Sequence, residues 1–129
     1  MTDNEHPNWI KARVACNAET WIERLYGVMK IDVQRATKET GREHRIDLRN
    51  GREITVSSLV EDSTDQWQAR LGLTIAAPNT LRAASSVGTD TIVNIHWTGH
   101  ECELSICEKK MEPWEISRRL LEPLFFGDD

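Results

Sequence analysis

The stretch from Asn17 to Gly41 predicts one long amphipathic helix with both ends marked in the sequence. At 3.6 residues per turn its apolar side chains share one face, and charged and amide side chains lie opposite. Asn17 can accept a hydrogen bond from the first turn, and Gly41 can adopt the left-handed conformation that ends many helices. The apolar face requires a second layer to cover it. Its members are Trp21, Ile22, Leu25, Tyr26, Val28, Met29, Val33 and Ala36.

Downstream of this helix the pattern predicts an antiparallel sheet of about five strands. Asn50-Gly51 is a strong hairpin signal between the first two. An odd loop over 49–51 places Ile46 and Leu48 on the same face as Ile54 and Val56, whereas a two-residue loop would separate the pairs, so we expect the odd loop. The expected strands are 43–49, 52–60, 68–76, 91–97 and 101–107, with a polar turn at 61–65.

Two segments between and beyond these strands predict further helices. Pro78, a capping Asn79 or Thr80, and Gly88 suggest a short helix within 77–88. Pro113 is suited to the first position of a C-terminal helix, which Pro123 would end or bend, leaving residues 124–126 as an apolar tail. Residues 9–16 fit a strand or a helix equally well.

These elements predict an α+β fold, in which the N-terminal amphipathic helix and the C-terminal helix pack on the antiparallel sheet. A chain of 129 residues is long enough for a single core. We expect a flexible N-terminus over residues 1–8 and one domain over residues 9–126.

Composition predicts a cytoplasmic protein. No apolar run approaches the ~18 residues needed to span a membrane, and the first residues do not resemble a secretory signal. Cys16, Cys102 and Cys107 are an odd number without zinc-like spacing, which favours reduced thiols.

Charge makes nucleic acid an improbable partner. Residues 1–60 hold 10 Lys/Arg and 9 Asp/Glu, whereas residues 61–129 hold 6 and 12. Nucleic-acid binding depends on concentrated Lys and Arg, and no basic stripe is present.

The most suggestive chemical motif is His96-Trp-Thr-Gly-His100-Glu-Cys102, since imidazole and thiolate bind zinc. A turn at Thr98-Gly99 would place His96 opposite Glu101 on one face, and His100 and Cys102 on the other, with Ile95 and Trp97. We therefore expect no metal and no cofactor. No serine lies in a nucleophile elbow, and the paired carboxylates lie in polar segments, so we expect no catalytic group either.

The sequence contains five tryptophans, a residue type favoured both in cores and at binding surfaces. Trp21 and Trp97 lie on predicted core faces, whereas Trp9, Trp67 and Trp114 stand at element edges, where core packing and partner contact both remain open. The candidate partner-binding residues are Trp67, Trp114, Phe125 and Phe126. We expect a homodimer that uses the third strand, through a free edge, or the C-terminal helix.

Two family resemblances bear on function. The expected order of helix, three strands, short helix, two strands and helix, over 17–125, resembles type III secretion chaperones, small acidic cytoplasmic dimers that hold an unfolded partner segment. Arg45-Ile-Asp-Leu-Arg49 is similar to the first motif of PilZ domains, β-barrel receptors for cyclic di-GMP, and implies phosphate binding by Arg45 and Arg49. Glu61-Asp-Ser63-Thr-Asp-Gln66 departs from the second PilZ motif.

Taken together, these patterns favour a non-enzymatic protein-binding or chaperone-like module. A PilZ-like small-molecule receptor for a cyclic dinucleotide is one alternative. A hydrolase or metal protein that uses His96 and His100 in the 96–102 hairpin is the other.

Overall fold

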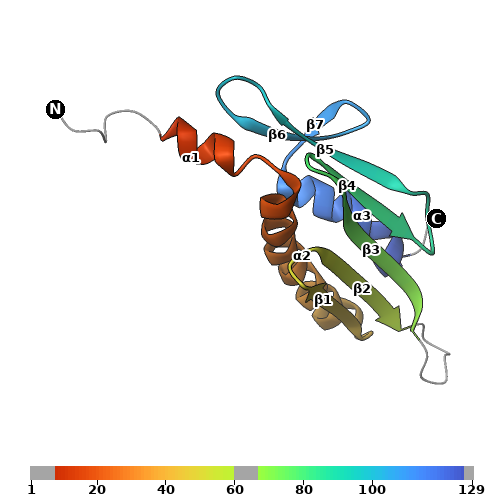
Figure 1. Ribbon diagram of the computed structural model, residues 1–129. Coiled ribbons are helices and arrows are strands. Elements are labelled where there is room, and N and C mark those ends of the chain that lie inside the picture. The colour runs from red at the N-terminus through yellow and green to blue at the C-terminus, as the bar shows by residue number, and fades with distance from the viewer. Residues whose placement is uncertain (1–7, 60–66, 127–129) are drawn as a thin grey trace.

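The computed structural model describes residues 8–59 and 67–126, in which two long helices pack on one face of an antiparallel sheet (Figure 1). The expected α+β class is confirmed, but the sheet has seven strands within these described residues rather than about five. The predicted turn at 61–65 and most of the expected N-terminal segment 1–8 lie outside the described residues. The elements are α1 (Trp9–Val14), α2 (Ala18–Thr40), β1 (His44–Arg49), β2 (Glu53–Leu59), β3 (Trp67–Ala77), β4 (Thr80–Ser85), β5 (Thr91–Trp97), β6 (Cys102–Ile106), β7 (Lys109–Met111) and α3 (Pro113–Phe126).

Helix α2 begins and ends where its sequence predicts. The Asn17 side chain accepts a hydrogen bond from the Thr20 N–H at 2.8 Å, and Gly41 ends the helix with a φ of 74°. The central positions of the apolar stripe, such as Leu25 and Met29, have no exposed surface. Segment 9–14, which the pattern left open, is helical.

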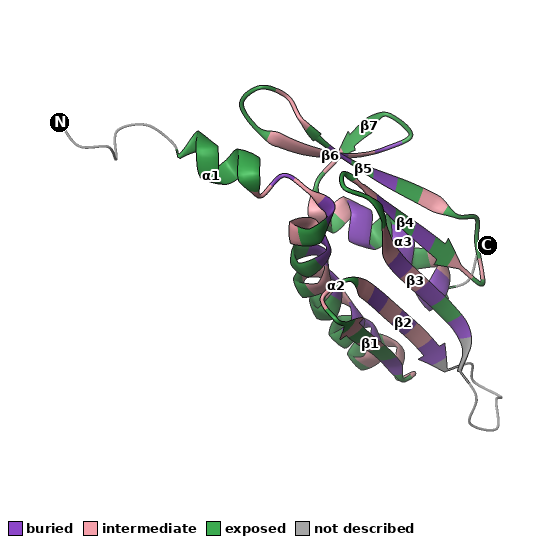
Figure 2. Ribbon diagram, in the orientation of Figure 1, coloured by how far each residue is buried: buried purple, intermediate pink, exposed green. Residues whose placement is uncertain are grey.

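The sheet is a meander in which each strand pairs with its neighbours in the chain, in the order β1-β2-β3-β4-β5-β6-β7. Its buried side chains lie on one face, toward α2 and α3, and the other face is open to solvent (Figure 2). Strand β3 is paired on both sides, so it offers no free edge. The expectation of a dimer through an edge of the third strand is therefore wrong, since among the described strands only β1 and β7 have free edges.

The first hairpin has the predicted faces but a shifted register. Leu48 pairs with Ile54 and Ile46 pairs with Val56, so all four share the core side, as the odd loop predicts. The loop consists of residues 50–52 instead of 49–51. Asn50 and Gly51 both have positive φ, which explains the shift, because this Asn-Gly pair forms the turn itself.

The short helix expected within 77–88 is wrong, because residues 80–85 form strand β4. Pro78 and Asn79 form a tight turn after β3, instead of a helix cap. Burial alternates along β4, with Leu81 and Ala83 inside and Arg82 outside. This period of two, which is typical of a half-buried strand, was the correct signal.

Strand β7 was not predicted at all. It has three residues, and its turn consists of Cys107 and Glu108, which both have positive φ. Such turns usually contain Gly or Asn, so the sequence carries no turn signal here.

Helix α3 begins at Pro113, as predicted, but Pro123 does not end it. The helix continues to Phe126, so residues 124–126 are its last turn and not a separate tail. Leu124 and Phe125 are buried, and their burial offsets the backbone hydrogen bond that proline cannot donate. Of residues 124–126, only Phe126 is exposed.

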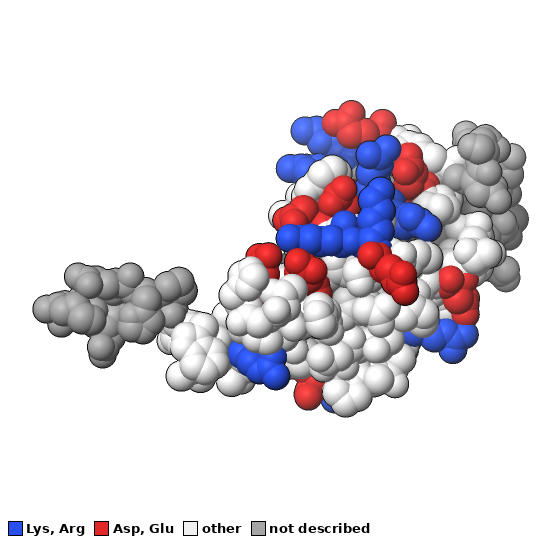
Figure 3. Space-filling model, turned by 90° about the horizontal axis from the view of Figure 1, so that it is seen from above, with Lys and Arg blue, Asp and Glu red and all other residues white. Residues whose placement is uncertain are grey.

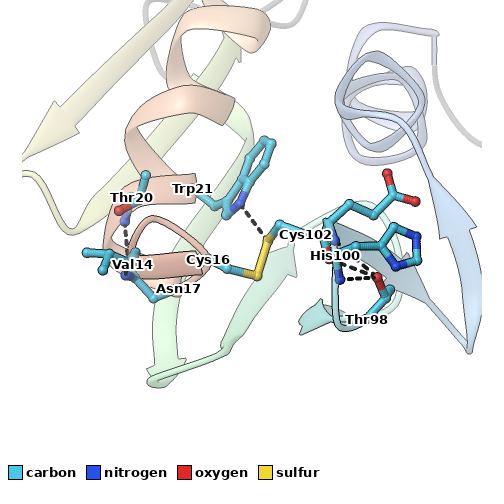
Figure 4. Close-up of a disulfide and its surroundings, with 9 residues drawn as sticks. Val14, Cys16, Asn17, Thr20, Trp21, Thr98, His100 and Cys102 are labelled. Carbon is cyan, nitrogen blue, oxygen red and sulfur yellow. Dashed lines mark hydrogen bonds between the residues drawn. A yellow bond between two sulfur atoms is a disulfide. The ribbon is translucent and has the colours of Figure 1, made fainter. Parts of the chain in front are cut away.

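The expectation of three reduced thiols is wrong for two of them. Cys16, directly before α2, forms a disulfide with Cys102 at the start of β6, and only Cys107 is free (Figure 4). The prediction of a cytoplasmic protein therefore loses its cysteine argument. Within the described residues, no helix combines the length and the apolar character that a membrane crossing needs.

Candidate functional site

A groove runs between α2 and α3 on the side of the helices that faces away from the sheet. It encloses about 670 Å³. The two helices run in the same direction, because Asp32 lies beside Ser117 at one end and Arg42 binds the carbonyl of Phe125 at the other. The lining includes both ends of α3, from Trp114 to Phe126, so the groove is roughly 18 Å long at 1.5 Å per residue.

The floor of the groove is apolar and its ends are aromatic. Ala36 of α2 and Leu121 and Phe125 of α3 form the floor. The Trp114 residue is 57% exposed at one end, and Phe126 is 64% exposed at the other. Large aromatic residues exposed at both ends of an apolar cleft are typical of a protein-binding surface.

Charged side chains form the walls. Asp32 accepts a hydrogen bond from the Ser117 hydroxyl at 2.7 Å and lies 3.9 Å from Arg35, and Arg118 pairs with Glu122 at 3.4 Å. Glu39 also lines the groove and makes no ion pair within the described part of the chain. The walls are therefore polar and slightly acidic, around an apolar floor.

A buried histidine supports the far end of the groove. The His44 ring packs against Phe125, with ring centres 4.8 Å apart, and its Nδ1 shares a 2.5 Å hydrogen bond with Ser58 Oγ. Burial, and secondarily the nearby Arg42 guanidinium, lower the pKa of His44 from its ordinary value of 6.5. This network holds Phe125 in place, and no carboxylate accompanies the His44–Ser58 pair within the hydrogen bonds of the described residues.

The structure brings three of the four predicted partner-binding residues into this groove. Trp114, Phe125 and Phe126 all line it, although Phe125 contributes from the buried floor. Trp67 begins β3 at a distance along the chain, and its side chain lies outside the described part. The α2 wall was missed, because Asp32, Arg35 and Glu39 read as an ordinary solvated helix side until α3 is placed beside them.

The two predicted phosphate-binding arginines lie on the solvent-facing side of the edge strand β1. Arg45 and Arg49 are both exposed, and Arg45 Nε is 3.3 Å from a Glu43 carboxylate oxygen. The segment 61–66, compared above with the second PilZ motif, lies outside the described residues. The structure therefore places the two arginines on one solvent-facing side of β1.

The predicted histidine hairpin has a different register from the one expected. Its loop is 98–101, so Trp97 pairs with Cys102, and His96 lies opposite Glu103 rather than Glu101. His100 is exposed in the loop. Cys102 does share a face with Ile95 and Trp97, as expected.

Two acidic residues of this hairpin form ion pairs with a lysine of β7. Lys110 lies 3.6 Å from Glu101 and 3.5 Å from Glu103, and these two carboxylates raise its pKa. Among the residues that the structure describes, no three His, Cys, Asp or Glu side chains converge as metal ligands would.

Figure 3 shows acidic and basic side chains side by side on the face that it presents. Such interspersed charge differs from the one-sign stripe of a nucleic-acid-binding surface.

Comparisons of the chain with models of known families, with curated proteins and with solved structures gave no match. The two family resemblances therefore remain hypotheses, and strand β4 alters the element order behind the first of them.

Proposed function

We propose that this chain is a non-enzymatic protein-binding module whose α2–α3 groove holds an apolar helical segment of a partner. The observation that carries the proposal is the apolar floor of Leu121 and Phe125 between the exposed aromatic ends, Trp114 and Phe126. An amphipathic helix that lays its apolar face into such a groove is a common mode of peptide recognition.

The dimensions and charges of the groove favour a helix over a small ligand. A length of roughly 18 Å matches a helix of about 12 residues. Glu39, which has no ion-pair partner in the described part, favours a segment with a basic residue beside its apolar stripe.

The proposal can be tested by selecting peptides of about 12 residues from a random library displayed on phage, with the full chain as target. We expect selected peptides with apolar residues at spacings of three and four and at least one Lys or Arg. Trp114→Ala and Phe126→Ala should each weaken their binding at least about tenfold, as for truncated interface hot spots.

Ile92→Ala is the matched control, because Ile92 is an exposed apolar residue of β5 outside the groove. Each variant should unfold at nearly the wild-type temperature, since the three residues are exposed. Selected peptides that bind the two groove variants as tightly as wild type would disprove the proposed site.

A further inference from the structure

Helix α1 is a largely exposed apolar arm, which meets the body through the Arg13 guanidinium, 5.5 Å from the centre of the Trp97 ring. It projects from the body of the molecule at the start of α2 (Figures 1 and 2), and none of its six residues is buried. Trp9 and Ile10 are more than half exposed, and Val14 is 70% exposed. Since so short a helix is marginal in water by itself, a stripe of this kind gains stability from packing against another surface.

The arm has the complementary chemistry to the groove. Lys11 and Arg13 are its only charged residues, whereas the groove walls carry Asp32, Glu39 and Glu122 against Arg35 and Arg118, an excess of one negative charge. The Lys11 side chain makes no ion pair in the described structure, and neither does Glu39. An apolar stripe with basic neighbours thus complements an apolar floor between slightly acidic walls, in which Glu39 is the charge left unpaired within the described residues.

The arm cannot reach the groove of its own chain. The disulfide holds the chain at Cys16, and beyond it the arm offers one connecting residue and a helix about 9 Å long. The near end of the groove, at Asp32, is 14 helical residues or roughly 21 Å beyond Ala18. The groove can therefore receive an arm only from another molecule.

From these observations we infer that a second copy of this chain occupies the groove, with α1 of each protomer inserted between α2 and α3 of the other. This inference rests on the proposed helix-binding groove and identifies an occupant, which at about 9 Å covers half of the groove, at the end formed by Glu39 and Phe126. A two-fold axis through the middle of α2 makes the exchange reciprocal, because it places the start of one α2 beside the end of the other.

The middle of α2 suits such a crossing. Gly27 and Ile31 lie on the exposed face, on either side of the central residue Met29. An added Cβ at Gly27 would meet nothing within 4 Å in one chain, so the position is open to an approaching helix. In an antiparallel pair Ile31 of one copy lies over Gly27 of the other, and Glu23 lies near Arg35.

The first test is the mass of the full-length chain in solution, measured by sedimentation at micromolar concentration. We expect a dimer. Ile10→Glu in the arm, Phe126→Ala in the groove and Gly27→Gln at the crossing should each weaken it at least about tenfold, and Ile92→Glu on the open sheet face should not. Gln has a higher helix propensity than Gly, so a loss of the dimer in the Gly27→Gln variant would not reflect unfolding of α2.

Two further variants test the charge pairing. Lys11→Glu and Glu39→Lys should each weaken the dimer a few-fold, and combining them should restore it, as expected for a direct but solvent-exposed ion pair. If the combined variant instead dimerises more weakly than either single variant, the two side chains do not form this pair.

Cross-linking identifies the contact directly. In a Cys107→Ser background, a chain with Ile10→Cys is mixed with a chain with Phe126→Cys under mild oxidation, and a covalent heterodimer is expected. A wild-type monomer, or a dimer that survives both Ile10→Glu and Phe126→Ala, would overturn the inference.

The outcomes separate the inference from the proposed function. If selected peptides bind the groove but the chain is a monomer, the groove is a helix site and the exchanged arm is wrong. If the arms cross-link to the groove but no peptide selected on the Ile10→Glu chain, whose arm no longer fills the groove, binds there, the self-association stands and the broader function is wrong.

Discussion

The indole N–H of Trp21 donates a hydrogen bond to Cys102 Sγ over 3.3 Å, and the same sulfur is bonded to Cys16 (Figure 4). These residues join the first turn of α2 to the start of β6, 81 positions away in the chain. The Ala18 N–H also donates to the carbonyl of Pro78 in the β3–β4 turn. The start of α2 is therefore held at several points, and α1 leaves the body from a rigid base.

Reduction of the disulfide should lower the stability of the fold. Cys16 and Cys102 are 86 residues apart, and closing so long a loop restricts the unfolded chain, so we expect Cys16→Ser/Cys102→Ser to lose about 2–5 kcal/mol of unfolding free energy. Urea denaturation with and without a reductant measures this loss.

Cys107→Ser is the control and should change stability by less than about 0.5 kcal/mol, because Cys107 is exposed. Thiol titration of the unreduced, denatured wild-type chain should detect one thiol. Three titratable thiols would show that the pairing does not form.

Leu25→Ala should destabilise the protein by about 2–5 kcal/mol. Leu25 has no exposed surface in the centre of the α2 stripe, so truncation leaves a cavity in the core. Denaturant unfolding provides the measurement, with the exposed Lys30→Ala as the comparison. A loss for Leu25→Ala as small as that for Lys30→Ala would mean that the stripe is not buried.

The free energy of unfolding should fall as the pH decreases below about 6.5. The lowered pKa of His44 means that the unfolded chain takes up a proton there before the folded chain does. Well above pH 6.5 the imidazole is neutral in both states and has no such effect. Between pH 7 and pH 5, His44→Gln should therefore show a shallower decline than wild type.

His96→Gln serves as the control for this titration, because His96 is exposed and distant from the buried pair. It should keep the wild-type dependence on pH. Equal slopes for wild type and His44→Gln would refute the role of His44.

The purified protein should hold no stoichiometric zinc, and a chelator should not shift its unfolding temperature. His96 lies opposite Glu103 on the sheet, His100 is in the loop, and Cys102 is occupied by its disulfide. A structural metal would contribute directly to folding, so its removal would be visible. One tightly bound zinc per chain in elemental analysis would contradict the hairpin geometry.

Local patterns in the sequence were sufficient to predict an element wherever its type and its ends depend on residues close together in the chain. The capped stripe from Asn17 to Gly41 predicts α2 because helix ends and helix faces depend on residues within a few positions of each other. The same reasoning places Ile46 and Leu48 on one face with Ile54 and Val56, since strands alternate with a period of two. Trp114 and the C-terminal phenylalanines were also identified as candidates from residue type and position.

Contacts between distant segments decided the rest. Pro78 and Asn79 fit both a helix cap and a hairpin turn, and pairing with β3 and β5 selected the turn. Cys16 and Cys102 are joined only because the packing of α2 against the sheet brings them together. The groove likewise exists only when α3 lies beside α2, because each helix alone presents nothing more than one wall of it.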